Sequence, residues 1–275
     1  MLKTAYSKND CQELRRLFIK RAQEVCGNSK DNCLLLSGGM DSVTALYSLL
    51  EAGVTFKAYT FYFKDWESAD LKSVQNLEKQ IGFPIEYLPI SNKYEDLIDD
   101  IKSSIKTSIK VFEKLREVKV ETTLALSQIE RIMPANSNVI SGDGGDPAVG
   151  FNRVVGKSVY VHGVDSRYVK DLRIAKESSE MEEVFEKRHN YIRMFKGEVV
   201  DFLLNFTPEA CNRRFPKSIL YYAFFEEHNK YHSYRKPKSF HKAANEKAMF
   251  NLMAMERGYK NALEMFKAIH KEMGE

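Results

Sequence analysis

This 275-residue chain lacks paired cysteines and long apolar runs. Its four cysteines, Cys11, Cys26, Cys33 and Cys211, form no CxxC pair, which argues against a zinc ribbon and against a disulfide framework. No apolar run approaches the ~18 residues that span a bilayer, and the first ten residues contain no apolar signal segment. We therefore expect a cytoplasmic protein without a membrane partner.

Strong charge of one sign and a Walker motif are also missing. The net charge of +4 is mild, so no concentrated basic face and no nucleic-acid partner are expected. Because the pattern GxxxxGK[ST] does not occur, γ-phosphate kinase chemistry is not implied. The length predicts one α/β domain with a smaller helical part. We divide the chain into an N-terminal helix (1–30), an α/β core (31–165) and a helical C-terminal region (166–275).

The most informative stretch begins at Asn32. Residues 33–36 form an apolar run without polar alternation, which is typical of a strand buried on both faces of a parallel sheet. Gly38 and Gly39 follow and allow a sharp turn, and Asp41 and Ser42 then open a helix with apolar residues at helical spacing. Strand, glycine turn and helix N-terminus together predict an anion site, since free amide groups and the helix dipole converge there.

The next segments alternate between strand and helix patterns. Residues 56–63 are aromatic and β-branched, residues 68–81 have helical periodicity, and residues 84–90 form a third strand pattern. This alternation predicts a doubly wound, mostly parallel sheet. Ligands of such sheets bind beyond the carboxyl ends of the strands, so residues 60–62 are expected to border the site.

A second glycine-rich turn follows a short apolar strand at 138–140. It reads Ser-Gly-Asp-Gly-Gly-Asp-Pro over residues 141–147 and carries two carboxylates, Asp143 and Asp146. Carboxylate oxygens suit Mg²⁺, which takes one or two of them together with water and phosphate oxygens. Alone, the heptad could be an ordinary polar turn. It gains weight because both glycine turns would lie at the same edge of one sheet.

The two turns together resemble a known superfamily. Residues 37–42 (SGGMDS) resemble the pyrophosphate loop of the N-type ATP pyrophosphatases, or PP-loop proteins. Residues 139–152 (VISGDGGDPAVGFN) resemble the second loop of asparagine synthetase and β-lactam synthetase in form and spacing. Pro147 departs from the glutamate that is usual there. The resemblance implies an adenine nucleotide alpha hydrolase-like α/β fold with a helical C-terminal part.

By the same resemblance, the site would hold ATP and Mg²⁺. Asp41 and Asp146 would bind Mg²⁺ on the pyrophosphate, and Asp143 would face the acceptor amine. Backbone groups near Thr60 would face the adenine. The residues implied in nucleotide binding are Leu36, Ser37, Gly38, Gly39, Asp41, Ser42, Thr60 and Gly142.

The catalytic lysine is ambiguous at this stage. Residues 234–240 (YRKPKSF) resemble the RKKxxF segment of asparagine synthetases, whose lysine neutralises charge as the acyl-adenylate and pyrophosphate form. With Arg235 and Phe240 aligned, the expected lysine falls on Pro237 or Lys236, and a one-residue slip in register selects Lys238. A lysine suits this role because its point charge can follow negative charge onto the leaving group. The competing interpretation is a basic loop that binds phosphate nonspecifically, or binds nothing.

The implied reaction is ATP-dependent amide formation. A substrate carboxylate would be adenylated with release of pyrophosphate, and ammonia or an amine would then displace AMP. Only about thirty residues precede the glycine loop, too few for the glutaminase domain of glutamine-dependent asparagine synthetases. Nitrogen would therefore come from free ammonia, a substrate amine or a separate ammonia-supplying partner. Two alternatives remain open: an enzyme that adenylates a nucleobase or tRNA oxygen, and a non-catalytic ATP- or AMP-binding module.

The C-terminal part has weaker signals. Residues 154–163 predict a hairpin or last strand, and residues 177–195, 199–204, 216–228 and 240 onward predict helices. His228 and His232 have a spacing that could ligate a metal on one helix face. We favour packing for this pair, because no carboxylate or cysteine nearby completes a tetrahedral set.

Overall fold

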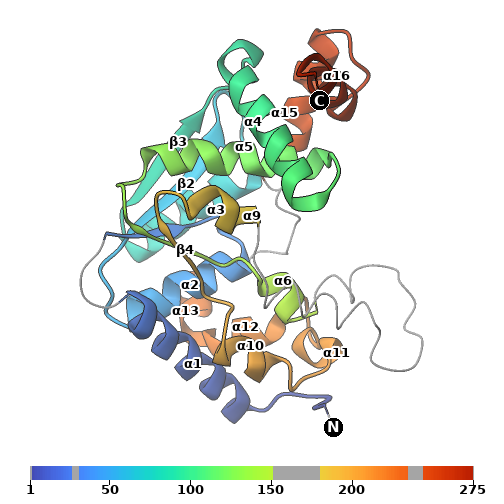
Figure 1. Ribbon diagram of the computed structural model, residues 1–275. Helices are drawn as coiled ribbons and strands as arrows, with labels where there is room; N and C mark the ends of the chain where they lie inside the picture. The colour runs from blue at the N-terminus through green and yellow to red at the C-terminus, as the bar shows by residue number, and fades with distance from the viewer. Residues whose placement is uncertain (1, 27–30, 151–179, 235–243, 275) are drawn as a thin grey trace.

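The computed structural model describes residues 2–26, 31–150, 180–234 and 244–274, and this part of the chain contains one sheet of five parallel strands (Figure 1). The strands are β1 (Asn32–Leu35), β2 (Lys57–Phe63), β3 (Ile85–Ile90), β4 (Asn138–Ser141) and β5 (Asn190–Arg193). Their order is β3-β2-β1-β4-β5, and every neighbouring pair is parallel. The chain therefore runs outward from β1 to β3 and returns to β4, which puts the topological switch point between β1 and β4.

The central strands are buried on both faces, as their continuous apolar runs predict. Leu34 and Ile140 belong to the hydrophobic cluster on one face of the sheet. Cys33 and Val139 belong to the cluster on the other face. All four are 0% exposed, so neither face of β1 or β4 meets solvent at these positions.

An asparagine ladder fixes the register of the three strands on the switch-point side. Asn32, Asn138 and Asn190 are register partners at the beginning of β1, β4 and β5. The side-chain amide of Asn138 donates to Asn32 over 2.9 Å, and that of Asn190 donates to Asn138 over 2.9 Å. Because the strands start level and each has four residues, the loops that leave β1 and β4 also begin level.

One face of the sheet is covered by helices from both halves of the chain. They are α1 (Lys8–Cys26), α2 (Met40–Glu51), α3 (Ala69–Ile81), α10 (Glu198–Leu203), α11 (Pro208–Cys211) and α12 (Ser218–Ala223), followed by α13 (Phe225–Lys230). Phe18 of α1 meets Phe195 edge to face, with ring centroids 5.1 Å apart. Long-range packing of this kind brings α12 next to α2 and thus close to the first glycine turn.

The opposite face is covered by α4 (Tyr94–Phe112), α5 (Glu117–Ile132) and α9 (Glu180–Phe185), and α15 (Glu246–Glu256) and α16 (Ala262–Glu272) pack against α4 and α5 (Figure 1). A short helix, α6 (Gly145–Ala148), follows the second glycine turn. Helices on both faces of a parallel sheet confirm the predicted doubly wound α/β class. In the described part of the chain, no helix has both the length and the apolar character needed to cross a membrane.

Most predicted core elements are confirmed, and one prediction is wrong. The strands expected at 56–63, 84–90 and 138–140 are β2, β3 and β4, and the helix expected at 68–81 is α3 with Ser68 as its N-cap. The helix expected over 177–195 ends at Phe185, and residues 190–193 form β5 instead. The edge of β4 offers these residues a ladder of hydrogen bonds, which outweighs their local helical pattern. The strand expected at 154–163 lies outside the described residues.

Candidate functional site

The first glycine turn joins the carboxyl end of β1 to the N-terminus of α2. Its two serines hold each other, because the Oγ atoms of Ser37 and Ser42 are 3.1 Å apart. Ser42 Oγ also donates to the Gly39 carbonyl over 3.1 Å. Gly39 is the N-cap residue of α2 and has no side chain to occupy the amides of the first helical turn. The turn therefore presents a preformed anion-binding helix end at the edge of the sheet.

Gly38 is the position in this turn where only glycine fits. Its φ is +67°, in the left-handed region, and a Cβ there would lie 2.7 Å from Ser73 Oγ. Ser73 Oγ donates to the Gly38 carbonyl over 3.2 Å. The contact ties the turn to α3 and orients it independently of any ligand.

The second glycine turn lies directly against the first. A Cβ on Gly142 would be 2.5 Å from the carbonyl carbon of Asp41 and 2.6 Å from the amide nitrogen of Ser42. A Cβ on Gly145 would lie 2.6 Å from Asp41 Oδ1. Both glycines are thus required by close approach rather than by a special φ. The turns meet at the switch point, as expected for loops leaving β1 and β4.

Lys217 joins the carboxylates of the two turns. Its Nζ lies 2.5 Å from Asp41 Oδ2 and also forms an ion pair with Asp146 Oδ1. The side chain of Lys217 is 6% exposed, that of Asp41 21% and that of Asp146 44%. The group is therefore buried on the lysine side and reaches solvent through Asp146.

An asparagine holds the backbone of Lys217. Lys217 has a φ of 62°, which is uncommon for a residue with a Cβ. Its N–H donates to Asn212 Oδ1 over 2.7 Å. Asn212 Nδ2 in turn donates to the carbonyls of Val149 (2.8 Å) and Pro208 (2.7 Å). Because Val149 ends the short helix that carries Asp146, one buried amide links the lysine to the second turn.

Burial and neighbouring charges both shift the pKa values of Asp41 and Lys217. Burial raises the pKa of the Asp41 carboxyl, Lys217 lowers it, and Asp146 and Asp143 raise it further. Burial lowers the pKa of Lys217, but the two carboxylates outweigh burial and hold that pKa above its ordinary value. Lys217 is thus kept as an ammonium ion, and its charge makes a close pair of carboxylates tolerable at the sheet edge.

The residues present fit a magnesium ion that is bound together with phosphate. Asp41 Oδ1 is buried and has no hydrogen-bond partner among the residues that the structure describes, which leaves one oxygen available to a cation. Asp41 and Asp146 reach the same ammonium, so they lie close enough to share one cation. Among the described residues, no group of three or more His, Cys, Asp or Glu side chains could hold a metal ion. A magnesium ion here would need phosphate and water oxygens, which is its usual coordination.

The other predicted site residues that the structure describes lie at the same edge of the sheet. Leu36 follows Leu35, the register partner of Tyr59, and therefore lies level with Thr60. Asp143 is half-buried, and the hydroxyl of Tyr191 is 3.5 Å from its Oδ2. Lys236 and Lys238 lie outside the described residues. The structure thus brings together the predicted nucleotide and metal residues of both turns.

Sequence analysis missed Lys217. No local pattern marks this residue, since it is a single lysine after Phe215 and Pro216 in a helical stretch. The only signal is its contact with Asp41, 176 residues earlier in the chain. A basic residue placed at two acidic turns by long-range packing cannot be recognised from spacing.

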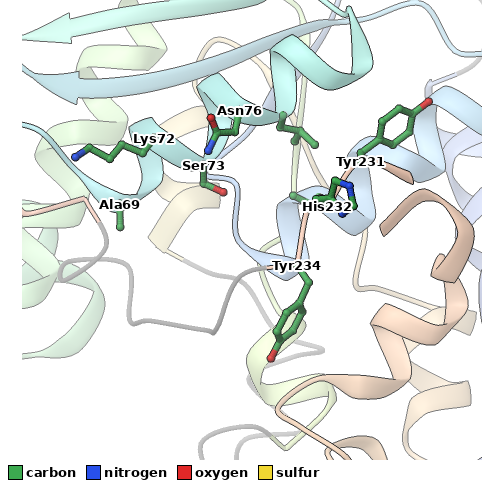
Figure 2. A pocket seen from close by; sticks show the side chains of 10 residues that line it. Ala69, Lys72, Ser73, Asn76, Tyr231, His232 and Tyr234 are labelled. Carbon is green, nitrogen blue, oxygen red and sulfur yellow. The ribbon is translucent and has the colours of Figure 1, made fainter. Parts of the chain in front are cut away.

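A groove of about 320 Å³ lies beside the first turn, between α3 and the segment after α13 (Figure 2). Ser73 and Asn76 line it from α3, and Tyr231 and His232 line it from the other side. His232 is exposed beyond the end of α13, whereas His228 is buried and its Nδ1 lies 2.8 Å from Ser233 Oγ. The two histidines therefore do not share a helix face. The groove borders the back of Gly38 through Ser73, and neither carboxylate of the paired turns lines it.

Comparison with known proteins gives structural likenesses only. No family model and no curated protein matches the sequence. The U34-tRNA thiolase NcsA from Methanococcus maripaludis, with its [4Fe-4S] cluster, is 14% identical over 98% of this chain and 81% of its own, with a TM-score of 0.42. NMN synthetase from Francisella tularensis is 15% identical over 86% of this chain and 100% of its own, with a TM-score of 0.35. Glutamine-dependent NAD+ synthetase from Acinetobacter baumannii, in complex with ADP, is 14% identical over 88% of this chain and 49% of its own, with a TM-score of 0.35.

Proposed function

We propose that this chain is an ATP-dependent enzyme that adenylates a carboxylate and transfers the acyl group to ammonia or an amine. The observation that carries the proposal is the meeting of Asp41 and Asp146, from two glycine turns, on the ammonium of Lys217. An open helix N-terminus, a pair of carboxylates and a buried cation at one edge supply what a triphosphate and its metal require.

In the proposed first step, a substrate carboxylate oxygen attacks the α-phosphorus of ATP. The bond between the α-phosphorus and the oxygen that bridges to the β-phosphorus breaks, and pyrophosphate leaves with the electron pair. The amides of the turn at Gly38 and Gly39 would hold the β- and γ-phosphates, and Lys217 would lie beside the charge that develops on the leaving group. Asp41 and Asp146 would hold Mg²⁺, which would supply further charge stabilisation when bound.

In the proposed second step, ammonia or an amine attacks the acyl carbon of the acyl-adenylate. AMP leaves with the electrons of the broken C–O bond, and the nitrogen loses a proton to give an amide. Asp143 is proposed to face the incoming nitrogen, with Tyr191 beside its carboxylate. Lys217 takes over the charge-neutralising role that the sequence assigned to Lys236 or Lys238, because it lies in contact with both metal-binding carboxylates.

Asp41→Asn tests the proposal. We expect this variant to lose conversion of ATP to AMP and pyrophosphate while its circular dichroism spectrum stays unchanged. Asp99→Asn, on an exposed position of α4, is the matched control and should keep full activity. The assay uses ATP, Mg²⁺ and a panel of carboxylates with ammonium, and parallel reactions with nucleosides or tRNA test adenylation of a nucleobase. Release of pyrophosphate at the wild-type rate by Asp41→Asn would defeat the proposal.

A further inference from the structure

Lys217 and a metal ion would need the same pair of carboxylates. The ammonium contacts Asp41 Oδ2 and Asp146 Oδ1, which are oxygens of the two carboxylates proposed to hold Mg²⁺. Two cations in contact with the same two carboxylates would lie close together and repel each other strongly, because little water screens the buried side of the group. The ammonium and the metal therefore compete for one place.

We infer that Lys217 is a built-in counterion that keeps divalent metal out of the nucleotide-free site, so that the metal enters with the nucleotide. The inference rests on the proposed function for the identity of the nucleotide. In the nucleotide-free protein, one ammonium leaves the two carboxylates with a net charge of about −1, which attracts a divalent ion weakly. When a triphosphate arrives, its oxygens offer the ammonium new partners and supply the ligands that the metal lacks.

The structure limits how the ammonium can move. The backbone of Lys217 is fixed by Asn212, which also binds the carbonyl of Val149. Movement is therefore confined to the flexible four-carbon stem of the lysine side chain. Asp146 is 44% exposed, so the open side of the group is the side from which phosphate and metal would approach.

Binding of Mn²⁺ to the nucleotide-free protein tests the inference. Free Mn²⁺ is followed by its electron paramagnetic resonance signal in titrations of wild type, Lys217→Met and Lys217→Gln. We expect weak binding to wild type and at least about tenfold tighter binding to both variants, because removal of the ammonium leaves two uncompensated carboxylates. Adding Asp41→Asn to Lys217→Met should abolish the gain. Two variants are used because either one alone could be unstable, and circular dichroism checks the fold of each.

Lys20→Met is the matched control. Lys20 also contacts two carboxylates, Glu24 at 3.7 Å and Glu198 at 2.7 Å, but all three side chains are more than 40% exposed. Water already solvates these carboxylates, so removal of the Lys20 ammonium should not create a Mn²⁺ site.

Two outcomes would overturn the inference. One is tight Mn²⁺ binding by nucleotide-free wild type that Asp41→Asn removes. The other is folded Lys217→Met and Lys217→Gln proteins that bind Mn²⁺ no more tightly than wild type. The Mn²⁺ titrations do not require turnover. If Mn²⁺ binding behaves as expected but the protein forms no AMP, the counterion role is supported and only the proposed reaction is contradicted.

Discussion

The sheet edge and the junction of α5 and α15 each hold a pair of carboxyl groups, and the two pairs differ in whether a cation contacts them. At the sheet edge, Asp41 and Asp146 share the ammonium of Lys217. At the junction of α5 and α15, Glu121 and Glu246 are both 0% exposed, and their carboxyl oxygens have no hydrogen-bond partner in the part of the chain that the structure describes. Among the described residues, a cation contacts the carboxylates at the sheet edge and none contacts Glu121 or Glu246.

The difference decides which carboxyls stay ionised. Burial and, less strongly, Glu117 raise the pKa of Glu121, Lys247 lowers it, and the net result is a pKa of about 8. Burial raises the pKa of Glu246 well above its ordinary value, and Glu121 and Asp70 add to the effect. At the sheet edge, by contrast, Lys217 opposes the effect of burial on Asp41. A buried carboxyl without a cation becomes a neutral packing group, whereas one with a cation remains available for phosphate and metal chemistry.

The largest effect is expected from Lys217→Ala, which would leave the carboxylates of the sheet edge without a cation in contact, as at Glu121 and Glu246. We expect formation of AMP to fall by about 10³-fold, because a preorganised charge beside the leaving group is lost. The free energy of unfolding should fall by about 2 kcal/mol, less than for a fully buried pair because Asp146 reaches solvent. Stopped assays of AMP and urea unfolding measure the two effects. The double variant with Asp41→Asn should regain stability without activity, and an unchanged rate for Lys217→Ala would contradict the comparison.

The buried pair Glu121 and Glu246 predicts a pH dependence of stability. The ordinary pKa of glutamate is 4.5 and that of Glu121 is raised to about 8, so the folded protein binds more protons than the unfolded chain between these two pH values. Stability should therefore fall as pH rises from about 4.5 to about 8, by roughly 3 kcal/mol for Glu121 at pH 7. Glu121→Gln and Glu246→Gln should flatten this slope. Their gain in stability over wild type should be larger at pH 8 than at pH 5. Urea unfolding across pH measures the slope, and exposed Glu186→Gln should leave it unchanged.

The sequence predicts the glycine turns of the sheet edge far better than it predicts the buried pair Glu121 and Glu246. The turns at Ser37 and Ser141 have local signatures, because a glycine turn after an apolar strand can be read from consecutive residues. Their meeting followed from a general rule on the edges of parallel sheets. The contact between Lys217 and Asp41 depended instead on how α12 packs against α2, for which no local pattern exists.

The same reasoning explains what the sequence could not give elsewhere. Nothing in the sequence around Glu121 or Glu246 indicates that both side chains become fully buried. The strand at 190–193 was mistaken for helix, since its hydrogen-bond partner β4 lies some fifty residues earlier. Local turns and strands were predictable, and side-chain partners across the fold were not.

The two glycine turns of the sheet edge are in contact, and one added methyl group can separate them. The glutamate pair depends on no such contact. Gly142→Ala would place a Cβ 2.5 Å from the backbone of Asp41, so the turns must separate. We expect AMP formation to fall by about 100-fold, since a shift of about 1 Å in positioning groups has effects of this size. Gly53→Ala is the contrast, because its φ is +68° and no atom lies within 4 Å of the new Cβ. That variant should lose about 1 kcal/mol of stability and no activity, and the opposite pattern would refute a steric role for Gly142.

The smallest effect is expected from Asn212→Ala, which leaves all three charges of the sheet edge. It removes the amide that anchors the lysine backbone and binds the carbonyls of Val149 and Pro208. Lys217 loses the acceptor for its N–H, and its φ of 62° is then held less firmly. Because the charges remain, the KM for ATP should change little, while kcat should fall by about tenfold as the ammonium is positioned less often. Asn205→Ala is the control, since Asn205 makes comparable side-chain hydrogen bonds to carbonyls at the exposed end of α10. If both variants lower kcat and raise KM equally, Asn212 acts through general stability, and the sheet edge differs from the glutamate pair by its cation alone.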